Sequence, residues 1–125
     1  MKKNYTDLAL LVLRLGFGGF MLTHGIPKFN YLSNPAEFPD PIHLGPTLSL
    51  LLCLIGEVIA PLLLIVGFKT KWAAIPAALT MMVAAFVVHA KDDLATKEHA
   101  LLYLFAFIAL FLAGAGKYSL DGLKK

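Results

Sequence analysis

Four long apolar stretches, separated by short polar segments, constrain the fold of this chain more than any other feature of its sequence. Each approaches or exceeds the roughly 17 residues that a helix needs to cross the hydrocarbon core of a bilayer. Strands are not expected, because a membrane barrel shows alternating polarity in segments of about ten residues. The four stretches cover residues 8–26, 44–68, 72–90 and 100–116.

This pattern predicts an all-α protein, an integral-membrane antiparallel four-helix bundle that forms one domain over residues 1–125. Only 15% of the residues are charged, against about 25% in soluble domains, which favours the lipid bilayer as surroundings. The formal net charge is +3, but the lysines lie between the apolar stretches and form no basic stripe. Nucleic acid is therefore not an expected partner.

The lysines outside the apolar stretches predict the orientation of the bundle, because cytoplasmic segments of membrane proteins carry an excess of Lys and Arg. Three of these lysines fall on one side (Lys28, Lys91 and Lys97), and seven fall on the other. This imbalance predicts that both termini are cytoplasmic and that residues 27–43 form an outer loop. Four prolines and three aromatic residues in this loop favour a lid along the outer interface. The seven lysines are Lys2, Lys3, Lys69, Lys71, Lys117, Lys124 and Lys125.

Two charged residues lie inside apolar stretches, where an ionised side chain costs ~2.5 kcal/mol or more and is usually functional. Arg14 lies seven residues after Asp7, where the first helix is expected to start. Glu57 lies nine residues before Val66, where the second helix is expected to end. At ~1.5 Å per residue their depths differ by about 3 Å, which predicts a buried ion pair between neighbouring helices. Pro61 is expected to kink the second helix near Glu57.

This predicted pair has two interpretations, which the sequence leaves open. A static ion pair would only fix the register of two helices. A catalytic pair would use Glu57 as a proton acceptor and Arg14 as its counter-charge.

All four histidines fall on the outer side in this topology, and Tyr103 follows His99 by four residues on the same helix face. Simple tolerance at the interface, a proton or quinone-headgroup site, and a metal site with a nearby carboxylate are the three interpretations. No two histidines have H-x-x-x-H spacing, so no metal site is predicted. The candidate substrate-binding residues are His24, Lys28, His89, His99 and Tyr103.

The single cysteine, Cys53, excludes an intrachain disulfide, a CxxC redox pair and a cysteine zinc site. Its position inside an apolar stretch favours a small buried hydrophobic side chain.

Several motifs resemble those of DoxX proteins over essentially the whole chain. Residues 13–16 (Leu-Arg-Leu-Gly) and 23–29 (Thr-His-Gly-Ile-Pro-Lys-Phe) are similar to the family's first-helix signature. Gly56-Glu57-Val58 and the tail at residues 114–121 (Gly-Ala-Gly-Lys-Tyr-Ser-Leu-Asp) fit as well. The family's polar signature positions fall here on Arg14, His24, Lys28 and Glu57.

DoxX proteins are small bacterial inner-membrane proteins with four transmembrane helices, and the resemblance implies this location for the chain. Named relatives are associated with thiosulfate:quinone oxidoreduction, with membrane oxidoreductase complexes in thiol or oxidative stress, and with tolerance of quinones or catechols. The resemblance therefore implies a membrane subunit of a redox-linked system. Its expected ligand is a quinone, and its expected partner is an oxidoreductase or a larger membrane complex.

The sequence leaves open whether the chain is itself an enzyme. It carries no cysteine pair and no recognisable haem or flavin motif, so no covalent cofactor is expected. Two other functions compete with the redox-linked one. The first is a non-enzymatic scaffold or accessory subunit of a larger membrane complex. The second is a small-solute or proton transporter, which in so small a bundle would need a homo-oligomer.

Overall fold

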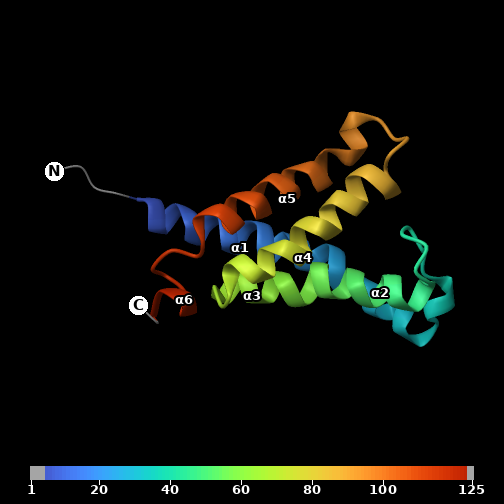
Figure 1. The fold of residues 1–125 in the computed structure, drawn as a ribbon, viewed down its shortest axis with the longest axis horizontal. Helices are drawn as coiled ribbons and strands as arrows, with labels where there is room; N and C mark the ends of the chain where they lie inside the picture. The colour runs from blue at the N-terminus through green and yellow to red at the C-terminus, as the bar shows by residue number, and fades with distance from the viewer. Residues whose placement is uncertain (1–4, 124–125) are drawn as a thin grey trace.

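The computed structural model describes residues 5–123, and in this part of the chain every regular element is a helix (Figure 1). The first long segment is α1 (Thr6–Gly25), which continues as the 3-10 helix η1 (Ile26–Ser33) and is followed by the short η2 (Pro35–Glu37). The second segment is continuous and consists of α2 (Pro46–Leu54), the π-helical turn η3 (Ile55–Ile59) and α3 (Ala60–Val66).

The third long segment is α4 (Thr70–Val83), which ends in a second π-helical turn, η4 (Ala84–Val88). The fourth is α5 (Leu94–Ala113), and the short α6 (Leu120–Leu123) follows it. The prediction of an all-helical chain with four long apolar helices is thus confirmed for residues 5–123. The first three segments lie within two residues of their expected bounds at each end, when η3, η4 and α3 are counted with their neighbours.

Helix α5 begins six residues before the apolar stretch that predicted it. Asp93 caps its start, since the carboxylate accepts hydrogen bonds from the backbone N–H and the hydroxyl of Thr96 at 3.0 and 2.8 Å. These bonds, the hydroxyl's first, hold the pKa of the Asp93 carboxyl below its usual range. The prediction missed this start because the first turns of α5 are polar, and hydropathy does not detect a cap.

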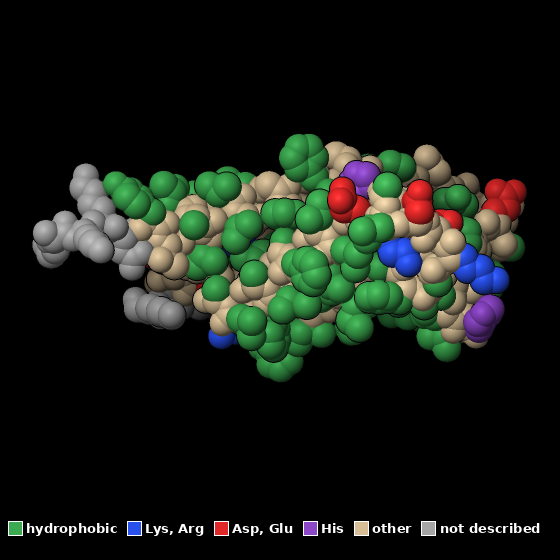
Figure 2. Space-filling view, turned by 90° about the horizontal axis from the view of Figure 1, so that it is seen from above, with side chains coloured by type: hydrophobic (Ala, Val, Ile, Leu, Met, Phe, Trp, Pro, Cys, Tyr) green, Lys and Arg blue, Asp and Glu red, His purple; other side chains and the backbone are tan. Residues whose placement is uncertain are grey.

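The long helices expose large apolar side chains over much of the surface (Figure 2). Phe20 is 68% exposed, Trp72 74% and Phe105 64%. Water-soluble monomers rarely expose contiguous apolar patches larger than a few hundred Å². Among the described residues, four segments are long and apolar enough to cross a bilayer: Thr6–Ser33, Pro46–Val66, Thr70–Val88 and Leu94–Ala113.

The interior is built where small residues let the helices approach each other. Ala74 and Ala77 of α4 are fully buried against α5, whose Phe107 and Leu110 are also fully buried. Inside a bilayer such close backbone approach replaces the hydrophobic effect as the main source of helix association.

The segment after α5 packs back onto the start of α1 and onto the turn between α3 and α4 (Figure 1). The Asp121 carboxylate accepts hydrogen bonds from the backbone N–H groups of Lys69 and Thr70 at 2.8 and 2.9 Å. Asp7 of α1 accepts one from the backbone N–H of Lys117 at 3.1 Å. Residues 114–123, here termed the tail, therefore cover the first turns of α1.

The orientation of the bundle in the membrane stays a prediction. Four of the lysines on which it rests, Lys2, Lys3, Lys124 and Lys125, lie outside the described residues.

Candidate functional site

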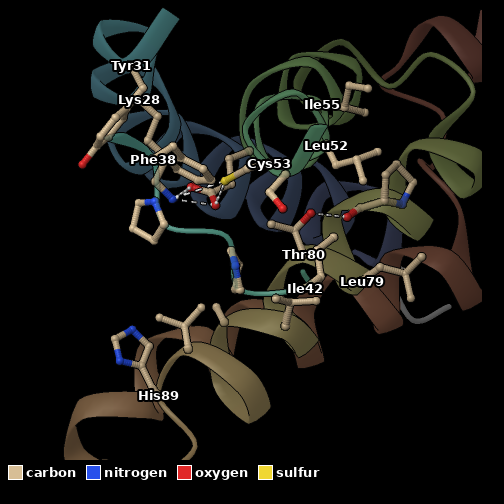
Figure 3. A pocket seen from close by; sticks show the side chains of 18 residues that line it. Lys28, Tyr31, Phe38, Ile42, Leu52, Cys53, Ile55, Leu79, Thr80 and His89 are labelled. Carbon is tan, nitrogen blue, oxygen red and sulfur yellow. Dashed lines mark hydrogen bonds and ion pairs between the residues drawn. The ribbon is translucent and has the colours of Figure 1, made fainter. Parts of the chain in front are cut away.

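Lys28, Glu57 and Cys53 form a hydrogen-bonded cluster near one end of the bundle. The Lys28 ammonium lies 2.8 Å from both carboxylate oxygens of Glu57. The Cys53 thiol donates to Glu57 Oε2 at 2.8 Å, and Lys28 Nζ lies 3.4 Å from the sulfur. Figure 3 shows the Lys28 and Cys53 side chains pointing toward one another, and dashed lines mark these bonds. Since Glu57 is only 4% exposed, Lys28 supplies the positive charge that a buried carboxylate needs.

Three elements bring these side chains together. Lys28 lies on η1, just after α1, whereas Cys53 on α2 and Glu57 on η3 lie four residues apart on one helical face. The π-helical turn is a local departure from α geometry of a kind that often occurs at functional sites. Gly25 permits the approach, because a Cβ there would lie 2.5 Å from the Glu57 carbonyl oxygen.

Substituting Gly25 with alanine is expected to push α1 away from η3 and to weaken the Lys28–Glu57 ion pair. The added methyl would also meet Val58 Cγ2 at 2.7 Å, and such overpacking costs about 1–3 kcal/mol. Thermal unfolding in lipid nanodiscs measures the loss. The matched control is Gly16→Ala on the same helix, where an added Cβ meets nothing within 4 Å. Equal stability of the two variants would contradict the close contact.

The predicted ion pair between Arg14 and Glu57 is wrong. Arg14 is fully buried, but its guanidinium donates to backbone carbonyl oxygens instead. It bonds Leu64 and Ile65 at the end of α3, at 3.2 and 3.0 Å, and it also bonds two carbonyls of the tail. These tail carbonyls belong to Ala115, at 3.1 Å, and Tyr118. The carboxylate of Asp121 also attracts the guanidinium through space.

The register of the two helices explains why the pair does not form. Gly18 of α1 packs against Pro61 and Ile65, and Gly25 packs against Glu57. Glu57 is therefore level with Gly25, eleven residues beyond Arg14, or about 16 Å along the helix at ~1.5 Å per residue. The prediction set the start of the first helix level with the end of the second, whereas α1 extends about two turns past the end of α3. The tail fills the space beside those turns.

A cavity of about 480 Å³ adjoins the cluster. Its walls are mostly apolar, and Lys28, Cys53 and Glu57 form a polar group at one side. Ser49, Thr80 and His89 add further polar side chains to the lining. Phe38, Pro39 and the neighbouring residues of the segment between η2 and α2 form another wall. Phe38 is buried and stacks edge-to-face on Tyr31, with ring centroids 5.1 Å apart.

Asp40 holds this covering segment in place. Its carboxylate accepts from the Ser49 hydroxyl at 2.5 Å, and from the backbone N–H groups of Gly45 and Leu44 at 2.8 and 3.1 Å. These bonds, the hydroxyl's first, lower the pKa of the Asp40 carboxyl from its usual value. The segment is thereby tied to the start of α2.

This tie gives the covering segment a predictable pH dependence. A carboxyl with a lowered folded-state pKa stabilises the fold fully above its unfolded pKa, about 3.9, and loses this effect as the pH falls through the folded value. Amide hydrogen exchange at Leu44 and Gly45 is expected to accelerate below about pH 4, relative to the intrinsic rate. Asp40→Asn should show faster exchange already at neutral pH. An unchanged rate in this variant would mean that Asp40 does not hold the segment.

A second cavity, of about 340 Å³, lies on the other side of the ion pair and is more polar. Lys28, Glu57 and His89 line both cavities. The His24 ring stacks edge-to-face on Tyr103, with centroids 5.8 Å apart, and His89 Nδ1 lies 2.7 Å from Asp92 Oδ2. The structure thus brings five sequence-derived candidates around one cavity: His24, Lys28, His89, His99 and Tyr103. Their role in binding stays a prediction.

Two features of this site differ from the predictions made from the sequence. Cys53 was interpreted as a small hydrophobic side chain, yet its thiol is part of the hydrogen-bonded cluster. Lys28 was predicted as a substrate-binding residue on the outer side, yet it is the partner of Glu57. The contact between Cys53 and Glu57 could have been predicted from their four-residue spacing on one helix. Within residues 5–123, no group of three or more His, Cys, Asp or Glu side chains is placed to hold a metal ion.

Comparisons with known proteins agree with the motifs. Residues 9–90, about two thirds of the chain, match the model of the DoxX family. An uncharacterized protein of Haemophilus influenzae is 31% identical over 129 aligned positions, which cover 96% of this chain and 85% of the relative. No solved structure matches the chain.

Proposed function

The chain belongs to the DoxX family and is a multi-pass membrane protein, and from this premise we propose that it is the quinone-binding membrane subunit of a redox-linked oxidoreductase system. The ring of the quinone would occupy the cavity beside Lys28 and Glu57. A partner oxidoreductase would supply the electrons.

The shape and chemistry of the 480 Å³ cavity are the observation that carries this proposal. Ligand sites of about 300–1,000 Å³ are typically apolar, with a few polar groups that fix the ligand's orientation. A quinone is a flat apolar ring with two carbonyl acceptors. The Lys28 ammonium has three donors, so it can bond a quinone oxygen while it remains paired with Glu57.

The second cavity supports a role in proton supply. Reduction of a quinone to a quinol takes up two electrons and two protons. Glu57 would accept and deliver a proton, with Lys28 in the counter-charge role that the sequence suggested for Arg14. His24 and His99 line the polar cavity on the other side of Glu57, and an imidazole can both donate and accept a hydrogen bond.

We further propose that the helices are antiparallel in a bacterial inner membrane, with both termini cytoplasmic and both cavities near the outer face. The positive-inside rule supports this orientation. Alkaline phosphatase, which is active only after export, tests it as a fusion partner. A fusion after Asp92, between η4 and α5, is expected to be active, and a fusion after Lys69, between α3 and α4, inactive. The reverse pattern would overturn the orientation.

Quinone binding is tested with the purified protein in lipid nanodiscs and a short-tailed ubiquinone. A bound ligand at 100 times its Kd stabilises the folded state by about 2.7 kcal/mol, which raises the thermal midpoint. Wild-type protein is expected to show this rise, and Lys28→Met is expected to abolish it. Lys97→Met, which removes a half-buried lysine of α5 that lines neither cavity, is the control and should show the same quinone-dependent rise as wild type. The absence of any quinone-dependent rise in wild-type protein would overturn the proposal.

A further inference from the structure

The cavity beside Lys28 and Glu57 has an apolar rim that is exposed on the outside of the bundle. Leu52 is 42% exposed and Ile55 44%, and Leu79 and Val88 are each 54% exposed. All four line the cavity. Figure 3 shows Leu52 and Ile55 on one helical segment and Leu79 on the next.

Two membrane-spanning segments contribute this rim. Leu52 and Ile55 belong to Pro46–Val66, and Leu79 belongs to Thr70–Val88, so their exposed surfaces face hydrocarbon. The two segments touch at Gly56, where an added Cβ would lie 3.0 Å from the Pro76 carbonyl oxygen. Beyond this contact α2 and η4 diverge (Figure 1). Residues of both elements line the cavity.

The side of the cavity toward the connecting segment is covered. Phe38 is buried there, stacked on Tyr31, and Asp40 ties the segment to Ser49. A ligand arriving from water on this side would have to displace this segment. A ligand dissolved in the bilayer meets only the apolar rim.

We propose that the gap between Leu52 and Ile55 on one side and Leu79 and Val88 on the other is a lateral portal through which a lipid-soluble quinone enters from the bilayer. The ring would lie against the Lys28–Glu57 pair, and the isoprenoid tail would cross the rim into the lipid. This inference rests on the proposed function, because it takes a quinone as the ligand. The combination of one buried polar group and one lipid-facing apolar exit fits a polar head with an apolar tail.

Narrowing the portal tests the route separately from the binding site. Leu79→Trp places a larger ring at the rim, and Phe105→Trp is the control, because Phe105 is 64% exposed on α5 and does not line the cavity. Leu79→Trp is expected to slow association of a long-tailed quinone about tenfold and to change the affinity for a tailless benzoquinone less than about threefold. The control should change neither.

A second measurement uses wild-type protein and so does not depend on the folding of a variant. A quinone with a photoreactive diazirine in the first isoprene unit of its tail is expected to label α2, η3, α4 or η4, as mapped by mass spectrometry. Labels confined to α1 or α5 would overturn the portal, and so would unchanged association in a folded Leu79→Trp variant. If neither quinone binds wild-type protein, the proposed function fails. If both bind and the portal results are negative, only the route fails.

Discussion

Replacement of Arg14 with methionine is expected to lower the free energy of unfolding by about 2–6 kcal/mol. The guanidinium is the donor to two tail carbonyls, those of Ala115 and Tyr118. A buried acceptor left without its donor costs about 1–3 kcal/mol. This substitution would leave one buried acceptor, at Ala115, and one part-buried acceptor, at Tyr118. The contacts with Leu64 and Ile65 would be lost as well, so α1 should loosen from the end of α3. The tail should detach from α1, although Asp121 still ties it to the turn after α3.

Thermal unfolding in nanodiscs measures the effect of Arg14→Met, and limited proteolysis of the tail reports its detachment. Arg14→Lys should be intermediate, because a compact ammonium cannot span carbonyls as widely as the planar guanidinium does. The control is Lys117→Met, which removes an exposed cation in the tail. A stable, protease-resistant Arg14→Met variant that no longer binds quinone would contradict the structural role of Arg14. It would indicate instead that Arg14 takes part in quinone binding.

The second large effect is expected at Glu57, in a double-mutant cycle with Lys28. Lys28→Met leaves a carboxylate that is 4% exposed without its counter-ion, and Glu57→Gln leaves the ammonium without its partner. Loss of one member of a fully buried pair costs about 3–5 kcal/mol. The Lys28 side chain is 31% exposed, and solvent reduces the cost, so about 2–3 kcal/mol is expected for Lys28→Met.

The double variant is expected to be more stable than the sum of the two single losses implies, because it leaves no uncompensated charge. A coupling free energy of about 1–2 kcal/mol between the two substitutions would show that Lys28 and Glu57 form a stabilising ion pair. Purely additive losses would show that the two side chains do not interact in the membrane. Cys53→Ala in the wild-type protein should lower the free energy of unfolding by less than Lys28→Met does, since a thiol is a weak donor.

Hydropathy predicted the helices of this fold well, because crossing a bilayer requires long uninterrupted apolar stretches. Hydropathy did not predict the ends of helices that are set by capping, nor the turns that are set by packing. Asp93 starts α5 by capping it, well before the apolar stretch begins. The π-helical turns at Ile55–Ile59 and Ala84–Val88 also carry no signal in a hydropathy pattern, since they depend on packing against neighbouring helices.

The sequence grouped several side chains that the structure also brings together, but it did not predict how they pair. His24, Lys28, His89, His99 and Tyr103 were grouped from their shared side of the membrane, and the structure places them around one cavity. The partner of Glu57 was misassigned because pairing depends on helix register, which follows from contacts such as Gly25 against Glu57. Depth estimated from helix ends cannot detect an offset of two turns. The tail supplies two of the hydrogen-bond partners of Arg14. No local sequence pattern links these tail residues to Arg14.

The hydrogen bonds of Arg14 have a consequence for biogenesis. Its tail acceptors, Ala115 and Tyr118, follow it by 101 and 104 residues in the chain. Since a polypeptide is made from its N-terminus, α1 leaves the ribosome long before these carbonyls exist. The insertion machinery must therefore accept a first span whose arginine is still unsatisfied, and final assembly of the bundle waits for the last stretch to be synthesised.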